Sequence, residues 1–163
     1  MNYRKELTLE YFKNLPSKHQ AYIFETKIGT KQKYTFKNRI HKKFFGKGIL
    51  DVEFPTEIII EGEHVYHPAF RTWRNMLSRA YYDKHKERYN CSVCEEWHSF
   101  GTFLAWWWDN APNSEHYSLY QLDKDHEANL LKVYSPEYCF FVPQCVNLQD
   151  RRSRKTGKLF NIN

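Results

Sequence analysis

The sequence has no long hydrophobic run. No apolar stretch approaches the ~20 residues that a helix needs to cross a bilayer. The opening stretch MNYRKELTLEYF lacks the apolar centre of a signal peptide. Internal repeats and low-complexity segments are also absent. These absences predict a cytoplasmic protein of one domain with no membrane partner.

Cysteine is scarce, with four residues in a chain of 163. In the cytoplasm they are expected to be reduced thiols or metal ligands rather than disulfides. Cys91 and Cys94 have the spacing of half a zinc site, which Cys139 and Cys145 could complete. The spacing of the second pair is unlike that of a zinc knuckle, and single cysteines beside Phe or Val usually pack as small apolar side chains. The pattern favours partly buried thiols and leaves a structural zinc ion as an alternative.

Positive charge is present in excess. Lys plus Arg number 25 against 19 for Asp plus Glu, which gives a net charge of +6, and aromatic residues make up 18% of the chain. A basic surface attracts polyanions, and aromatic side chains can stack on bases. Composition therefore favours nucleic acid as the partner.

Residues 1–45 are expected to form a basic N-terminal appendage, followed by a domain over residues 46–163. Helical spacing of apolar residues predicts a helix from Leu7 to Leu15, and Tyr22 to Phe24 are expected to form a short strand. Residues 31–43 interleave basic and aromatic side chains, a pattern typical of segments that follow a phosphate backbone. A solvated surface explains the pattern equally well. The candidate DNA contacts in this run are Lys37, Arg39, Lys42 and Lys43.

Two further helices are predicted in the centre of the chain, after a hairpin around Gly62. The first begins at Pro68 and has a buried apolar stripe, with Arg71 and Arg74 on its other faces as candidate phosphate contacts. The second carries three consecutive tryptophans, residues 106–108. Neighbouring helical side chains diverge by ~100°, so at least one Trp must contact another element or a binding surface.

Residues 120–150 are expected to form a strand, a loop, a second strand over Tyr138 to Val142, and a helix after Pro143. Asp123, Asp125 and His126 follow the first strand, and Asn147 lies on the first turns of the helix. Carboxylate and amide oxygens suit a hard divalent cation such as Mg²⁺. His126 is the candidate base. Residue types alone favour a different interpretation, in which these side chains cap the hairpin and the helix end.

Several uncommon residues recur in a characteristic order between residues 46 and 150. They are Trp73, Met76, Leu77, Arg79 and Tyr81; Tyr89, Val93, Cys94, Glu96, Trp97, Phe100, Phe103 and Trp106; Leu122 to Asp125; Lys132 to Glu137; and Cys139, Phe141 to Pro143 and Asn147. In this order the chain resembles the small phage-encoded HNH-type endonucleases. The stretch GKGILDVE from Gly46 looks like the strand that precedes the first helix in these proteins.

This resemblance implies an α+β fold in which a ββα-metal motif, also called a His-Me finger, packs on aromatic-rich helices. It implies a DNA endonuclease or nickase that uses Mg²⁺ or a similar ion. By position, Asp123 and Asn147 look like the metal ligands. Lys124, Asp125 and His126 are the catalytic candidates, with Lys124 placed to contact the scissile phosphate. The basic residues after the motif, Arg151, Arg152 and Arg154, would bind phosphates.

Lys124 departs from the family pattern, because it stands where the general-base histidine is expected. An ammonium group already carries its proton and is a poor base at neutral pH. His126 is the candidate substitute. The alternative is a protein that keeps this fold without catalysis and binds DNA or inhibits a host protein, in the host cytoplasm if the chain is phage-encoded.

Overall fold

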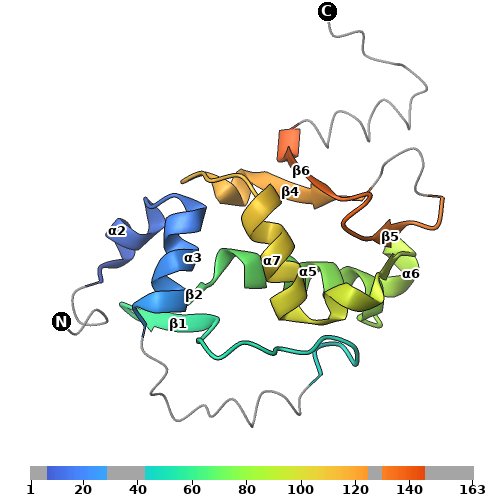
Figure 1. Cartoon of the computed structure of the whole chain (residues 1–163), viewed down its shortest axis with the longest axis horizontal. Coiled ribbons are helices and arrows are strands. Elements are labelled where there is room, and N and C mark those ends of the chain that lie inside the picture. The colour runs from blue at the N-terminus through green and yellow to red at the C-terminus, as the bar shows by residue number, and fades with distance from the viewer. Residues whose placement is uncertain (1–6, 29–42, 125–129, 146–163) are drawn as a thin grey trace, which may run out of the picture.

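A computed structural model describes residues 7–28, 43–124 and 130–145, drawn in colour in Figure 1. Two helices, α5 (Pro68–Tyr81) and α7 (Phe100–Asn110), pack against each other at the centre. At one end lie α2 (Leu9–Lys13), α3 (Ser17–Thr26) and the hairpin of β1 (Glu57–Ile60) and β2 (Glu63–Tyr66). At the other end lie α6 (Lys86–Tyr89), β3 (Ser92–Val93) and β5 (Val133–Tyr134). The structure is α+β, as expected.

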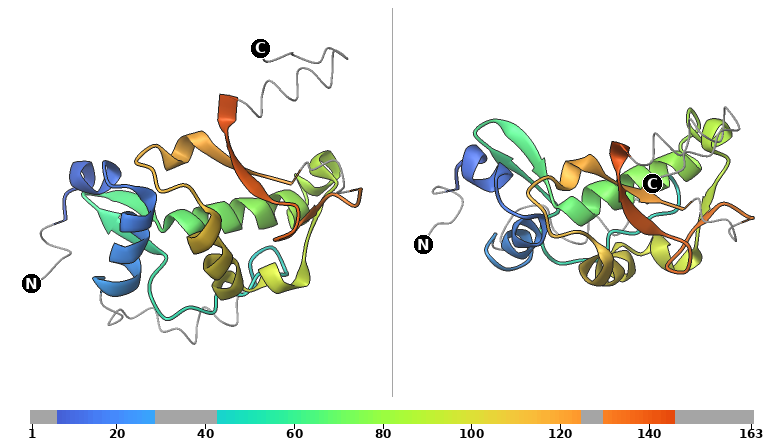
Figure 2. Two further views of the ribbon diagram at one scale, coloured as in Figure 1. Left: turned by 45° about the horizontal axis from the view of Figure 1, so that its top comes forward. Right: turned by 90° about the horizontal axis from the view of Figure 1, so that it is seen from above.

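A third pair of strands runs above α5 and α7, as both views in Figure 2 show. β4 (Tyr120–Asp123) pairs antiparallel with β6 (Phe140–Pro143), so that Asp123 lies opposite Phe140. The short 3₁₀ helix η2 (Tyr117–Leu119) leads into β4. Gln144 and Cys145, the last described residues, are helical. The predicted order of strand, strand and helix is therefore present up to residue 145, and the second strand begins two residues later than expected.

The predicted start of α5 is confirmed. Pro68 is in the first turn, and the His67 side chain caps the helix by accepting a hydrogen bond from the Ala69 N–H. The apolar stripe faces the core. Its buried members are Phe70, Trp73, Met76, Leu77 and Ala80.

The three tryptophans of α7 diverge, as the helical geometry requires. Trp107 is fully buried. Trp106 stacks on Phe141 of β6, with ring centroids 5.8 Å apart. Trp108 donates a 3.2 Å hydrogen bond from Nε1 to the Glu25 carboxylate on α3. The helix thus contacts the core, β6 and α3 through successive residues.

The strand predicted over Tyr22 to Phe24 is wrong, because these residues belong to α3. Helical spacing lets Ala21 join the main core, while Ile23 and Phe24 pack with β1 and β2. This tertiary packing outweighs the weak β preference of Tyr-Ile-Phe. The described part of the segment expected as an appendage, residues 7–28, is therefore packed against the rest of the chain.

The local structure on either side of β1 is changed at one place and confirmed at another. In place of a strand over residues 46–53, the structure has single bridges from Phe44 to Gly48 and from Ile49 to Ser99. The hairpin around Gly62 is confirmed, with both turn residues, Glu61 and Gly62, at positive φ (50° and 81°). A two-residue turn of this kind matches the twist of the strands. The parallel pairing of β3 with β5 was not predicted.

No helix among the described residues is long and apolar enough to span a membrane.

Gly48 packs directly against α5. A Cβ atom at this position would lie 2.4 Å from Leu77 Cδ1 and 2.9 Å from Trp73 Cη2. Both side chains are fully buried, so neither can move away freely. We expect Gly48→Ala to lower the free energy of unfolding by about 1–3 kcal/mol, measured by urea denaturation. The neighbouring exposed change Lys47→Ala should shift it by less than about 0.5 kcal/mol. Equal stability of the two variants would contradict this packing.

His67 is fully buried among aromatic rings, including those of Phe24, Phe54, Phe100 and Trp107. Its Nδ1 accepts the Ala69 N–H, so the neutral ring carries its proton on Nε2 and donates to Glu25 at 3.2 Å. Burial lowers the pKa of His67 below 6.5, and the hydrogen bond and charge of Glu25 oppose this only in part. The folded protein therefore holds the neutral imidazole.

The stability of the protein should consequently depend on pH below 6.5. There the unfolded chain binds a proton that folded His67 does not, so the free energy of unfolding falls as the pH decreases, by at most about 1.4 kcal/mol per pH unit. Urea denaturation between pH 7.5 and 5 would measure the slope, and NMR of the labelled imidazole would follow His67 directly. The change His19→Gln, at an exposed histidine, should leave the slope unaltered. A His67 ring that titrates at or above its ordinary pKa would contradict the assignment.

Candidate metal and nucleic-acid site

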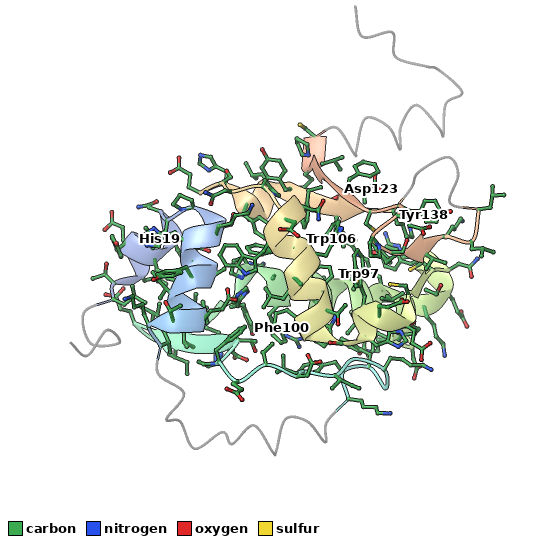
Figure 3. The ribbon with its side chains drawn as sticks, viewed as in Figure 1. His19, Trp97, Phe100, Trp106, Asp123 and Tyr138 are labelled. Atoms are coloured by element: carbon green, nitrogen blue, oxygen red, sulfur yellow. The ribbon has the colours of Figure 1, made fainter. Side chains whose placement is uncertain are left out.

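Asp123 ends β4 and is buried, with 8% of its surface exposed. Figure 3 shows it near the end of the strand pair. Leu122, the preceding residue, points into the main core, and the two-residue period of a strand turns Asp123 to the other side. The charges of Asp123 and Lys124 both act on the Cys139 thiol, which places these three side chains in one neighbourhood. The strand pair thus holds a carboxylate and an ammonium group close together.

Lys124 lies over an aromatic ring. Its Nζ is 5.3 Å from the ring centroid of Tyr134 on β5. The Tyr134 hydroxyl accepts a long hydrogen bond from Arg79 Nη1 of α5, at 3.4 Å. Burial raises the pKa of Tyr134, against the opposing effect of Arg79, so the hydroxyl is neutral at physiological pH. Two cations therefore contact one neutral tyrosine: Lys124 lies over the ring face, and Arg79 lies at the hydroxyl.

The described residues supply one carboxylate for a cation at this place. No group of three or more His, Cys, Asp or Glu side chains that could hold a metal ion occurs within residues 7–28, 43–124 and 130–145. Mg²⁺ keeps several waters and often takes only one or two protein carboxylates, so Asp123 with one further oxygen ligand fits its chemistry. The predicted partner Asn147 and the catalytic candidates Asp125 and His126 lie outside the described residues.

All four cysteines are described, and none of them forms a disulfide. Cys139 is buried, Cys91 and Cys94 are half-buried, and Cys145 is exposed. They belong to no group that could hold a metal ion among the described side chains, so the four-thiolate zinc site considered as an alternative is not assembled in this structure. Burial raises the pKa of Cys94 to about 11 and that of Cys139 to about 12. Both are protonated thiols at neutral pH.

The predicted DNA contacts fall into three groups. Arg71 lines a cleft, whereas Arg74 is exposed on another part of α5 and does not line it. Lys43 is exposed at the start of the second described range. The remaining candidates lie outside the described residues: Lys37, Arg39, Lys42, Arg151, Arg152 and Arg154.

The cleft has a volume of about 500 Å³ and is bounded by α5, β4, β2 and η2, with side chains from α2 and α3. From α5 it receives Arg71, Asn75 and Arg79, which are spaced four residues apart and so share one face of the helix. Of these three residues, Arg71 alone was predicted from the sequence to contact phosphates, together with Arg74 outside the stripe. Four-residue spacing of polar side chains opposite the apolar face is the signal that would have identified it.

Comparisons with models of protein families, with curated proteins and with solved structures find no match for this chain. The fold and the site are therefore interpreted from their own geometry.

The reactivity of the cysteines should follow their burial. At pH 8, iodoacetamide is expected to modify exposed Cys145 first, while Cys94 and Cys139 react about 100-fold and 1,000-fold more slowly than ordinary thiols because so little thiolate is present. Mass spectrometry of the peptides would follow each site, with urea-unfolded protein as the control. If added zinc protected all four cysteines together, the expected dependence of reactivity on burial would be wrong and a four-thiolate zinc site would be supported.

Proposed function

We propose that this protein is a DNA endonuclease or nickase of the HNH type, dependent on Mg²⁺ or a similar divalent ion. The observation that supports this best is the antiparallel pair β4–β6, followed by helical residues, with a buried carboxylate at the end of β4. A buried carboxylate beside cationic side chains is a common arrangement for binding a metal and a phosphate together.

Asp123 would bind the divalent ion, with Asn147 as the second protein ligand. When bound, such an ion neutralises charge on the phosphate and on the leaving oxygen. Lys124 and Arg79 would hold the non-bridging phosphate oxygens, because Lys124 directly follows Asp123 and both cations contact Tyr134. His126, or Asp125, would act as the base that takes the proton of the attacking water.

DNA is the proposed partner, attracted by the net charge of +6. Arg71 would contact phosphates from the cleft, and Arg74 from the exposed side of α5. Lys43 and the basic residues on either side of the described ranges would add contacts that do not depend on sequence.

A plasmid assay tests the proposal. Supercoiled plasmid should be nicked with Mg²⁺ or Mn²⁺ and remain intact with a chelator. Asp123→Asn and Asn147→Ala should each reduce nicking by more than about 100-fold, since even indirect partners of a metal ligand typically contribute 10–100-fold. Asp109→Asn, the same change at an exposed site on α7, is the matched control and should leave nicking unaltered.

Binding of Mn²⁺, followed by paramagnetic NMR broadening, gives a readout besides activity. Broadening should be centred on β4 and β6 and should disappear in Asp123→Asn. The proposal is wrong if no divalent ion supports cleavage by folded protein, or if Asp123→Asn cleaves as well as the unchanged chain.

Lys124 favours a second candidate function. It stands at the expected base position, and its ammonium group lies against Tyr134 rather than serving as a base. A protein with this fold and without catalysis would bind DNA, or bind and inhibit a host protein. Tight DNA or protein binding by folded protein, without cleavage across several metals, would favour this alternative.

A further inference from the structure

The cleft beside α5 is lined by more cationic than anionic side chains. Arg71 and Arg79 line it, and neither forms an ion pair with a carboxylate of the described residues. The other ionisable groups on its walls, apart from tyrosines, are already engaged. Lys13 pairs with Glu63 at 3.0 Å, His64 pairs with Glu57, and Glu115 contacts His116. Glu115 is the one carboxylate among the described residues that line the cleft, so Arg71 and Arg79 leave these walls with an excess of positive charge for an anionic ligand.

The spacing of these charges suits a chain of anions. Arg71 and Arg79 are eight residues apart on α5, which places them about 12 Å apart along the helix axis. Asn75 lies between them on the same face and can donate and accept hydrogen bonds. A ligand that contacts the whole stripe must carry negative charge at two separate points. A nucleic-acid backbone has this property, whereas a single phosphate does not.

The walls of the cleft add aromatic and neutral polar surface. Tyr66 of β2, Tyr120 of β4 and Tyr117 of η2 all line it. The Tyr117 hydroxyl accepts a 2.8 Å hydrogen bond from Trp107 Nε1 and is 2.5 Å from Thr72 Oγ1, so its position is set by the core. Burial raises the pKa of Tyr117 to about 12, so the hydroxyl adds no negative charge that would repel a phosphate.

One end of the cleft reaches the candidate metal site. Tyr134 lines the cleft, and the same ring has Lys124 on its face and Arg79 at its hydroxyl. Lys124 directly follows Asp123 at the end of β4. A strand that entered along Arg71 and Asn75 would therefore arrive beside the carboxylate that we assign to the metal.

We propose that this cleft binds a single nucleic-acid strand, with phosphates at Arg71 and Arg79 and bases against its tyrosines. A volume of about 500 Å³ is that of a pocket for a small ligand, which suits a few nucleotides of one strand better than a duplex. The inference extends the proposed nuclease function: the preferred substrate has an unpaired segment next to the scissile bond. Strand binding itself requires no cleavage.

Fluorescence anisotropy with a labelled oligothymidine of about ten nucleotides tests this binding in chelator, where no cleavage can occur. Arg71→Gln should weaken binding about five- to tenfold. It should also reduce the slope of log affinity against log salt by about 0.7, the value for one phosphate contact on a single strand. Arg71→Lys, which keeps the charge, should retain most of the affinity. Lys47→Gln, an equal loss of charge at an exposed site that does not line the cleft, should change neither quantity.

Arg79 also contacts Tyr134 and lies over the Tyr89 ring, so thermal unfolding must first show that Arg79→Gln is folded. Arg71 is exposed, so its replacement should leave the fold intact, and it alone can decide the test if Arg79→Gln unfolds. The inference would be overturned if Arg71→Gln and Lys47→Gln bound the oligothymidine with equal affinity and equal salt dependence. It would also be overturned by tighter binding of blunt duplex through the same arginine, or by full competition by equimolar thymidine monophosphate, which would indicate a mononucleotide pocket.

The nicking assay separates this inference from the proposed function. Arginine-dependent strand binding by a protein that never cleaves would support the cleft and reject the nuclease. Nicking that is unaffected by Arg71→Gln, on both blunt duplex and substrates with an unpaired segment, would support the nuclease and reject the cleft as its substrate track.

Discussion

The buried imidazole of His67 is the contact on which the arrangement of the helices depends. It caps the first turn of α5, donates to Glu25 of α3 and packs between the rings of Phe100 and Trp107 on α7. Glu25 in turn accepts a hydrogen bond from Trp108 of α7. A buried polar side chain is costly unless both ring nitrogens are satisfied, and here both are. The three helices are therefore held in one relative position by a single residue and its carboxylate partner.

The core positions the strand pair through aromatic contacts rather than through a continuous sheet. Phe141 of β6 stacks on Trp106 of α7 and packs against Tyr117 at 5.9 Å. Tyr117 is tied to Trp107 and Thr72 by its hydroxyl. Because both sides of this contact are rigid rings, the end of β4 is held at a defined place relative to α5. That relation allows Asp123 on the strand and Arg79 on the helix to serve one proposed site.

The residues proposed to bind the substrate and the residue proposed to bind the metal lie in separate regions. Asp123 is buried at the end of β4, while Arg71 and Asn75 are exposed along the cleft. Tyr134 connects the two regions, since it carries Lys124 on its face and Arg79 at its hydroxyl. Because the hydroxyl stays neutral, the connection preserves the positive charge that a phosphate requires. A strand in the cleft and a cation at Asp123 would thus meet at the same pair of basic side chains.

Local patterns in the sequence were sufficient for much of this structure. Pro68 and the apolar stripe defined α5, Gly62 defined a hairpin, and the angular divergence of residues 106–108 required contacts outside α7. Such features depend on backbone geometry and side-chain period, which short segments determine by themselves. The order of the strands around Asp123 was also predicted. Local patterns gave the wrong prediction for Tyr22 to Phe24. The helical state of this segment depends on partners in β1 and β2 that are more than thirty residues away.

The chemical environment of the site came only from the tertiary structure. No spacing rule relates Lys124 to Tyr134, or Tyr134 to Arg79, because these contacts join a strand end, another strand and a helix. The parallel pairing of β3 with β5, which brings Tyr134 to this place, joins segments forty residues apart. The sequence by itself determined which residues could bind a metal or a phosphate. Folding decided which of them lie together, because burial and charge act across space rather than along the chain.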